Sequence, residues 1–366
     1  MKRRVLHVIP TLERTGAAKQ LTLLTGGLSP NDFDVHVCAL ARGGPFAKDL
    51  ARQGIPLAII DQHWKFNPAA YWQLRRHVSR LKPDVVHTWT FAANSYGRAA
   101  ALGAGVRNIV ASESCVDPWK AWHHLAIDRH LTKRTAKIVV NGRGVQEFYV
   151  GQGLPAEKFR LIPSGVGPAA ASTVSREQLL AELNLPPGAK LMGAVGRLCL
   201  QKRIKDLIWA TDLLKVIRDD AHLLIIGDGP QRQILERYRR LCQLEDKVHF
   251  LGKRDDVPRL MPHFNQLWLA SGYEGLSNAV MEAMSCGVPV VATDISGNRE
   301  LVVHDQTGYL SPVGDRANFA RFAHKILENS ELAARLGAAG KQRMAHEFTV
   351  GAMVERHAAL YREIME

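Results

Sequence analysis

The stretch Glu274–Glu282 reads EGLSNAVME and contains two carboxylates with seven residues between them. The apolar run Leu267–Ala270 precedes it and Val288–Ala292 follows it, a pattern that predicts a strand, a helix and a second strand in succession. Ser277 is a favourable N-cap for a helix that begins near Asn278, because its hydroxyl can accept a free amide hydrogen of the first turn. The first carboxylate is therefore expected on a loop at the carboxyl end of a strand, and the second on the next helix.

The spacing of Glu274 and Glu282 argues against hydrolysis of a glycosidic bond. Eight helical steps span ~12 Å, whereas the carboxylates of hydrolytic pairs lie roughly 5 to 9.5 Å apart. The two groups are better suited to hold two ends of one extended, hydroxyl-rich ligand. Between them lies a predicted helix N-terminus, which favours phosphate, and its backbone amides belong to Gly275, Leu276, Ser277 and Asn278. A nucleotide sugar has this outline of sugar, phosphates and ribose.

A second loop carries two cations. The run KLMGAVGRLCLQK, which ends at Lys202, predicts an apolar strand followed by a glycine-containing loop. Gly193 and Gly196 are expected to let the backbone approach a ligand closely. Arg197 offers a planar fork for phosphate oxygens and Lys202 a mobile point charge, which suits a departing diphosphate. The alternative is that Arg197 pairs with a structural carboxylate such as Asp228.

Residues 190–315 resemble the C-terminal half of a family 4 glycosyltransferase. The matching motifs are VGRLCLQK, IIGDGP, FLGKRDDV, SGYEGLSNAVMEAMSCGVPVVATDISGNRE and HDQTGYLSP, and the N-terminal half is similar more loosely through VLHVIPTLERTGAAKQ, DVVHTW and FRLIPSGV. The resemblance implies the GT-B fold, an α/β architecture of two Rossmann-like, doubly wound parallel-sheet domains that face each other across a cleft. It also implies transfer of a sugar from a nucleotide donor with retention at the anomeric carbon.

The resemblance assigns roles to matching residues. Arg197 and Lys202 would hold the donor diphosphate, and Glu274 would lie beside the transferred sugar as the third catalytic residue. Glu282 would bind the ribose hydroxyls. Gly16 and Ala17, at the N-terminus of the first predicted helix, would add backbone contacts to the donor.

Acceptor contacts are expected in the N-terminal half. His87 and Trp89 end a predicted strand and face the cleft by position, although His87 could equally be a satisfied structural histidine. Many family members carry a histidine in the sugar pocket after the strand that corresponds to Arg107–Ala111. This chain has serine, glutamate and serine there, so Glu113 or Ser114 is expected in its place.

Length and alternation of strands and helices predict two domains. The 366 residues suffice for two ordinary cores. We expect an acceptor-binding domain over residues 1–168, with the C-terminal helix 349–366 packing back on it, and a donor-binding domain over 169–348. The small and turn-forming residues Pro163–Ser172 mark the hinge. The expected strands are Arg4–Ile9, Asp34–Leu40, Pro56–Ile60, Asp84–Thr88, Arg107–Ala111 and Lys137–Asn141, then Lys190–Val195, His222–Ile226, Val248–Leu251, Gln266–Ala270 and Val288–Ala292.

Composition favours a cytoplasmic protein. Hydrophobic residues make up 46% and charged residues 23%, as in soluble globular chains, and no apolar run approaches the roughly 18 residues that span a bilayer. The start MKRRVLHVIP fits a first strand better than a cleaved signal. The five scattered cysteines indicate a reducing compartment and argue against zinc.

Positive charge is concentrated in the N-terminal half. Residues 1–168 contain 23 Lys/Arg and 11 Asp/Glu, a net charge of +12, and the remainder has a net charge of +1. The densest stretches are Arg75–Lys82 and Lys120–Lys137, the second beside Trp119 and Trp122. Such a surface suits an anionic membrane, although a solvated face without a partner remains the alternative. Nucleic acid is not expected, because no recognition motif is present.

Neither a metal nor a cofactor is expected. The Asp32-Phe33-Asp34 sequence fits an Asp-x-Asp metal motif but opens a strand after Pro30 and Asn31, so turn chemistry explains it. No residue stands out as a covalent nucleophile, so same-face attack with the departing phosphate as base is the hypothesis.

The predicted function is that of a retaining hexosyltransferase that moves a sugar from a UDP- or GDP-type donor to a glycan or lipid-linked acceptor in polysaccharide or glycolipid synthesis. Peripheral contact with the inner face of a membrane is part of this prediction. Two alternatives stay open. One is a non-catalytic sugar-nucleotide-binding protein, and the other is an epimerase or phosphorylase on the same scaffold.

Overall fold

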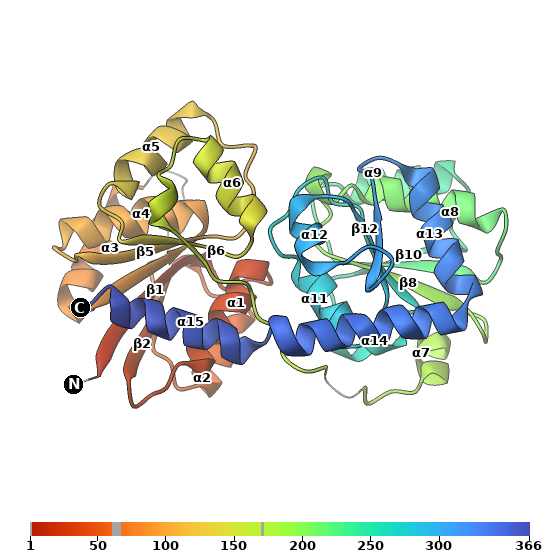
Figure 1. Cartoon of the computed structure of the whole chain (residues 1–366), viewed down its shortest axis with the longest axis horizontal. Helices are drawn as coiled ribbons and strands as arrows, with labels where there is room; N and C mark the ends of the chain where they lie inside the picture. Colours follow the sequence, from red (N-terminus) through yellow and green to blue (C-terminus); the bar gives the residue numbers. More distant parts are fainter. Residues whose placement is uncertain (1, 61–66, 170–171) are drawn as a thin grey trace. The chain divides into compact units, whose positions relative to one another are not determined.

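The protein is described by a computed structural model that covers residues 2–60, 67–169 and 172–366. The chain divides into two compact units, the first formed by Met1–Gly165 with Thr349–Glu366 and the second by Val166–Phe348 (Figure 1). The chain passes from the first unit to the second between Gly165 and Val166, and returns to the first between Phe348 and Thr349. Residues 170–171 of the predicted hinge lie outside the described residues.

Among the described residues, the first unit contains a seven-stranded parallel sheet in the order β3-β2-β1-β4-β5-β6-β7. Its strands are β1 (Arg3–Thr11), β2 (Phe33–Arg42), β3 (Leu57–Ile59), β4 (Val85–Trp89), β5 (Asn108–Glu113), β6 (Lys137–Val140) and β7 (Phe159–Leu161). Its helices are α1 (Gly16–Gly27), α2 (Phe46–Arg52), α3 (Pro68–Leu81), α4 (Thr90–Gly103), α5 (Trp122–Thr132), α6 (Arg143–Gly151) and α15 (Val350–Glu363), with a 3-10 turn at Ala156–Lys158.

The apolar sequence of β1 explains why helices cover both faces of this sheet. Val5 and Ile9 belong to a core shared with α1 and α15, whereas Leu6 and Val8 belong to a core shared with α3 and α4. Successive strand residues point to opposite faces, so a strand with buried apolar residues on both faces must be covered on both sides. This is the doubly wound arrangement predicted from the sequence.

The second unit, over residues 172–348, contains a six-stranded parallel sheet in the order β10-β9-β8-β11-β12-β13. Its strands are β8 (Lys190–Val195), β9 (Ala221–Ile226), β10 (Val248–Gly252), β11 (Gln266–Leu269), β12 (Val290–Thr293) and β13 (Gly308–Ser311). Its helices are α7 (Arg176–Glu182), α8 (Ile204–Lys215), α9 (Arg232–Leu241), α10 (Val257–Leu260), α11 (Asn278–Ser285), α12 (Ser296–Leu301), α13 (Arg316–Glu328) and α14 (Ser330–Glu347), with 3-10 turns at Leu200–Lys202 and Met261–His263.

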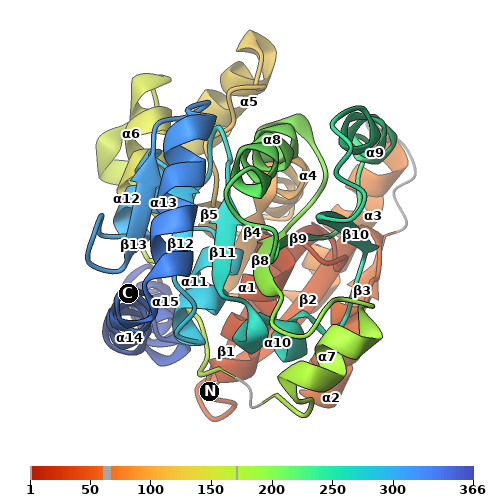
Figure 2. The same cartoon turned by 90° about the vertical axis from the view of Figure 1, so that its right-hand side faces the viewer.

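This sheet is also covered on both faces. Trp268 of β11 packs in a core with α8, α9 and α13, and α8 and α13 lie side by side (Figure 2). Leu267 and Leu269 of the same strand pack in a second core with α7, α11 and α14. The covered sheet positions the loops at the carboxyl ends of β8, β9 and β11 on one edge, where ligands of open α/β sheets bind.

Two short strands are absent from the predicted set. β7 has three residues and β13 has four, and each joins the edge of its sheet. Runs this short show too little periodicity to be recognised locally. The structure also begins the strand predicted at Val288 two residues later, at Val290.

The C-terminal helix α15 is part of the first unit. Thr349 caps it by accepting a hydrogen bond from the Ala352 amide at 3.1 Å, and its apolar residues pack in the core with α1. The Tyr361 hydroxyl reaches into the sheet and shares a 2.6 Å hydrogen bond with the His87 ring. At the surface, Arg362 pairs with Asp32 at 3.1 Å.

None of the helices within the described ranges is long and apolar enough to span a bilayer.

Candidate functional site

Glu274 lies on the loop between β11 and α11. It is only 8% exposed, and its Oε1 accepts a 2.7 Å hydrogen bond from the Ser271 hydroxyl. The same oxygen forms an ion pair with the ammonium group of Lys202, which comes from the loop after β8. Two predicted site residues from separate loops are therefore in direct contact. Of the other predicted contacts, Gly16, Ala17, His87, Trp89 and Glu113 belong to the first unit, and the rest belong to the second.

Backbone contacts hold these two loops together. The Gln201 side chain donates to the Tyr273 carbonyl at 2.9 Å, and the Gly272 amide donates to the Gln201 carbonyl at 2.8 Å. Gln201, next to Lys202, is thus hydrogen-bonded to residues next to Glu274. The position of Lys202 beside Glu274 therefore does not depend on the salt bridge alone. Ser271 and Gln201 are not among the residues predicted from the sequence, because a position shortly after a strand is the one local feature that marks them.

Arg197 is exposed, and its guanidinium has no hydrogen bond or ion pair within the part of the chain that the structure describes. The alternative pairing with Asp228 is not observed, because Asp228 Oδ1 instead accepts from the Gly229 amide at 2.7 Å. Arg197 is therefore available to an anionic ligand at the same edge of the sheet as Lys202.

Glycines allow the loops after β8 and β9 to pack directly on each other. A Cβ atom on Gly227 would lie 1.9 Å from the Gly196 carbonyl oxygen, and one on Gly229 would lie 2.4 Å from the Leu198 carbonyl oxygen. The expectation for Gly193 was wrong. Its Cβ would lie 2.2 Å from the ring of Phe264, so this buried position is small because of core packing and not because a ligand approaches it.

Helix α11 begins at Asn278 with Ser277 at the N-cap position, as predicted, but the hydroxyl of Ser277 makes no capping hydrogen bond. The predicted cap contact is thus wrong, and the first turn also lacks an acidic residue. Gly275 and Leu276 precede the helix as buried residues. Glu282 is half-buried on the second turn, as its position in the sequence predicts.

In the first unit, Gly16 and Ala17 are the first two residues of α1. Thr15 is the N-cap, and its hydroxyl accepts a 3.2 Å hydrogen bond from the Ala18 amide. Gly16 is exposed at this helix start, where a backbone amide can face a ligand.

The structure does not place His87 and Trp89 at an accessible strand end. His87 is fully buried and hydrogen-bonded at both ring nitrogens, to Tyr361 at 2.6 Å and Ser112 at 2.7 Å. Trp89 is 4% exposed and donates to His7 at 3.1 Å. Burial, reinforced by His7 and His357, lowers the pKa of His87 well below its ordinary value. The cleft-facing placement is therefore corrected, and the structural-histidine alternative is the one that fits.

Glu113 ends β5 at the centre of a buried polar network. Its carboxylate accepts from Asn94 at 2.9 Å, Tyr149 at 3.1 Å and Lys120 at 3.1 Å. Burial raises the pKa of Glu113, although Lys120 partly opposes this effect. The carboxylate also borders a pocket of about 320 Å³ in the first unit.

Lys120 does not belong to the basic surface in which the sequence placed it. Its ammonium is buried and contacts Glu113 at 3.1 Å, Asp128 at 3.0 Å and Tyr149 at 2.9 Å. Burial alone would lower the pKa of Lys120, but the surrounding carboxylates raise it overall. Arg98, also buried, completes the network through Asp128 at 2.6 Å.

The Asp-x-Asp sequence carries structural contacts. Asp34 accepts from Arg4 at 2.7 Å and from His36 at 3.0 Å, and Asp32 pairs with Arg362. The hydrogen bond from Arg4 lowers the pKa of Asp34. These contacts fit the predicted structural reading of the motif.

Two family descriptions match the chain, one in each half. "Glycosyltransferase Family 4" matches residues 14–169, and "Glycosyl transferases group 1" matches residues 175–343. The chain belongs to family 4 of the glycosyltransferases, with a second half of the group 1 type.

Characterised relatives and solved structures agree with this assignment. N-acetyl-alpha-D-glucosaminyl L-malate synthase of Bacillus anthracis is 30% identical over 51% of this chain and 49% of its own length, so the match spans about half of that relative. The UDP-Gal:alpha-D-GlcNAc-diphosphoundecaprenol alpha-1,3-galactosyltransferase of Escherichia coli is 26% identical over 71% of this chain and 70% of the relative. The crystal structure of Anabaena Alr3699/HepE in complex with UDP-glucose superposes with a TM-score of 0.87 at 21% identity, over 98% of this chain and 99% of that one. The predicted GT-B class, with two Rossmann-like parallel-sheet domains, is confirmed.

Proposed function

We propose that the protein is a retaining glycosyltransferase that moves a sugar from a nucleoside-diphosphate sugar to a glycan or lipid-linked acceptor. The observation that carries the proposal is the contact between Lys202 and Glu274, beside the exposed Arg197, on one edge of the second sheet. Cations there suit a diphosphate, and a carboxylate next to them suits sugar hydroxyls. The UDP and UDP-glucose complexes of a protein with the same fold favour a UDP-type donor.

The roles follow from these positions. Arg197 and Lys202 bind the diphosphate, Glu274 orients the transferred sugar, and Glu282 holds the ribose. The amides of Gly275, Leu276, Ser277 and Asn278 contribute at the helix start, and Gly16 with Ala17 add backbone contacts from the first unit. Glu113 takes part on the acceptor side. His87 and Trp89, which are buried, contribute to the acceptor side only by packing in the core.

The reaction follows from stabilising the departing diphosphate. The bond between the anomeric carbon and the phosphate oxygen breaks as the acceptor oxygen bonds to the same face of that carbon. The acceptor proton passes to an oxygen of the departing phosphate. Before the nucleotide sugar binds, Lys202 is paired with Glu274. As the diphosphate departs, Lys202 also donates hydrogen bonds to its new negative charge.

Since Arg197 and Lys202 supply positive charge to the diphosphate, the transfer proceeds without a divalent metal ion or another cofactor. EDTA is expected to leave turnover unchanged. A loss of turnover that manganese restores would contradict this part of the proposal.

The protein works in the cytoplasm at the inner face of a membrane, in the synthesis of a polysaccharide or glycolipid. The net charge of +12 in residues 1–168 supports this placement, as does Trp122, which is 80% exposed at the start of α5. The diphosphoundecaprenol acceptor in the name of the Escherichia coli relative supports a lipid-linked acceptor.

The proposal is tested by thermal unfolding with UDP, GDP, ADP and their common sugar conjugates. A ligand that binds only the folded protein raises the unfolding temperature. One nucleotide should raise the unfolding temperature selectively. Glu282→Ala should weaken the binding of that nucleotide by roughly 10- to 100-fold, which corresponds to the loss of one hydrogen bond to a charged group. The exposed Glu331→Ala serves as the matched control. No shift with any nucleotide would overturn the proposal, and binding without release of free nucleotide in the presence of acceptor extracts would favour a non-catalytic binder.

A further inference from the structure

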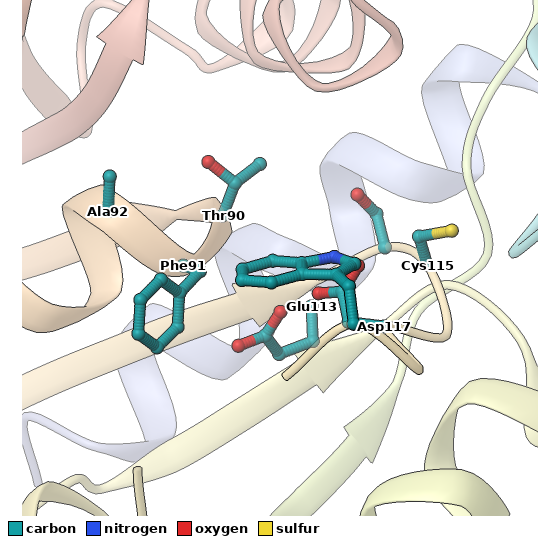
Figure 3. Close-up of a pocket in the computed structure, with 8 residues that line it drawn as sticks. Thr90, Phe91, Ala92, Glu113, Cys115 and Asp117 are labelled. Carbon is teal, nitrogen blue, oxygen red and sulfur yellow. The ribbon is translucent and has the colours of Figure 1, made fainter. Parts of the chain in front are cut away.

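A pocket of about 320 Å³ lies in the first unit at the carboxyl ends of β4 and β5. Thr90, Phe91 and Ala92 line it from the start of α4, and Glu113 and Asp117 line it from the end of β5 and the segment that follows (Figure 3). Trp119 also lines the pocket. The volume is at the lower end of the range for small-molecule sites. It therefore suits a single ring better than a long oligomer.

The aromatic wall of the pocket is held in place without a ligand. The Trp119 side chain is 50% exposed, and its Nε1 donates to Asp117 Oδ1 at 3.0 Å. The ring of Phe91 meets the Trp119 indole edge-on at 5.5 Å, and His124 packs against both rings. A flat, exposed indole fixed in this way offers an apolar face at little further entropic cost.

The polar side of the pocket offers hydrogen-bond acceptors. Asp117 accepts from Trp119 at 3.0 Å, and Glu113 accepts from Asn94 and Lys120. The one hydroxyl hydrogen of Tyr149 lies between Asp117 at 2.9 Å and Glu113 at 3.1 Å and is donated to one of them at a time. An ionised carboxylate has about four acceptor positions. Both groups can thus still accept a hydrogen bond from a ligand.

The nearby cation has no donor hydrogen left for an anionic ligand. Lys120 has three donor hydrogens, and its ammonium already contacts Glu113, Asp128 and Tyr149. Donors come instead from the start of α4, which has no side-chain cap and no acidic residue in its first turn. Donors, acceptors and an apolar face together match the hydroxyls and C–H face of a sugar ring, whereas a uronate or phosphate would meet two carboxylates.

We propose that this pocket binds an uncharged hexose ring, the terminal residue of the acceptor, stacked on Trp119 with hydroxyls bonded to Glu113 and Asp117. This inference rests on the proposed transferase function and adds the class of acceptor to it. It selects neutral sugars against uronates and sugar phosphates.

The test is saturation-transfer NMR with p-nitrophenyl glucoside, galactoside and N-acetylglucosaminide, with the glucuronide as the anionic probe. At least one neutral glycoside should bind the wild-type protein better than the glucuronide. Trp119→Ala should weaken that binding by about tenfold or more, while the matched exposed tryptophan variant Trp122→Ala should not. Equal binding to Trp119→Ala, no binding of any neutral glycoside, or preference for the glucuronide would overturn the inference.

A second variant tests the charge argument without removing the Trp119 indole. Asp117→Asn keeps the size of the side chain and should let the glucuronide bind while the neutral glycoside weakens. Unchanged selectivity would overturn the role of the carboxylate. Nucleotide-induced thermal shifts, recorded on the same variants, separate the two proposals. If the shift is retained but glycoside binding does not depend on Trp119, the pocket assignment alone fails, whereas absence of any nucleotide shift in the wild type means that the transferase proposal fails.

Discussion

Lys202 and Glu274 show how one contact between two residues connects separate loops to one chemical step. Lys202 comes from the 3-10 turn after β8, and its side chain is 17% exposed. If the lysine is removed, the Ser271 hydroxyl is the hydrogen-bond donor that Glu274 keeps among the described residues. A charge that has lost its partner in a partly buried site is costly, so the lysine affects both the orientation of Glu274 and the stabilisation of the leaving group.

Lys202→Ala is expected to lower kcat by roughly 10²- to 10³-fold, as for removal of one group that stabilises developing charge. The fold should persist, as judged by circular dichroism, because the loop is also held by Gln201. Lys205→Ala, an exposed lysine on the adjacent helix α8, is the control and should retain activity. Near-normal turnover of Lys202→Ala would remove the lysine from the mechanism.

At the scale of elements, the packing of the loops after β8 and β9 depends on glycine. Gly227 has φ +140°, and a Cβ there would lie 1.9 Å from the Gly196 carbonyl oxygen. A backbone atom cannot move aside as a flexible side chain can. These two loops therefore have to move apart if a side chain is introduced at Gly227. The loop after β8, which carries Arg197, is then displaced.

Gly227→Ala should destabilise the second unit by about 1–3 kcal/mol and weaken nucleotide binding, because the strained backbone and the loop displacement act together. Thermal unfolding and nucleotide titration measure the two effects. Gly167→Ala is the matched control, since its Cβ would have no neighbour within 4 Å. Wild-type stability and affinity in Gly227→Ala would show that the loops tolerate separation.

Helix α5 is the element that best fits a membrane surface. Trp122 is 80% and Ile127 42% exposed, and Lys133 and Arg134 are exposed just after the helix. Apolar side chains beside cations favour the interface of an anionic bilayer.

Trp122→Ala combined with Lys133→Glu and Arg134→Glu should reduce sedimentation with phosphatidylglycerol vesicles several-fold, because each basic residue near the surface contributes about 1 kcal/mol. Sedimentation with neutral phosphatidylcholine vesicles should be weak throughout. Leu241→Ala, which changes a 72% exposed apolar residue of α9, is the control and should behave as wild type. If the triple variant sediments like the wild type, α5 is not the contact surface.

At the scale of the whole molecule, buried histidines connect stability to pH. Burial, with a smaller effect of His357, lowers the pKa of His7 to about 3. Burial lowers the pKa of His357 to about 4 and, in the second unit, that of His249 to about 4. Unfolded histidines bind protons near pH 6.5, so between that pH and about 4 the unfolded chain carries more protons than the folded one.

Stability should therefore be highest above pH 6.5 and fall as the pH drops towards 4, by up to ~1.4 kcal/mol per pH unit for each such histidine. Urea unfolding at pH 7, 6 and 5 measures this slope. His357→Asn should make the slope shallower, although it also removes the hydrogen bond to Met353, so the slope and not the absolute stability is compared. A slope as steep as in the wild type would contradict the assignment of His357 as a buried neutral group.

Much of the architecture follows from local sequence. Apolar runs such as Leu191–Val195 predict buried parallel strands, because both faces of such a strand must be covered. The edge strands β7 and β13 were not predicted, because runs of three or four residues show no clear hydrophobic period. Such short strands form because they pair with a neighbouring strand. The positions of Arg197, Glu274 and Glu282 on loops and a helix start could also be predicted, because strand ends and helix starts are encoded in nearby residues.

The sequence alone therefore determined the two doubly wound sheets and the loops that carry the charged residues, since hydrophobic period and turn chemistry act over a few positions. Only the tertiary structure decided which charges are buried and which are free. Lys120, which lies in a basic run, turns inward to three acidic side chains, and His87 is enclosed by Tyr361, 274 residues away. The surroundings of such groups come from distant segments, so burial and pairing energies depend on contacts that no local pattern contains.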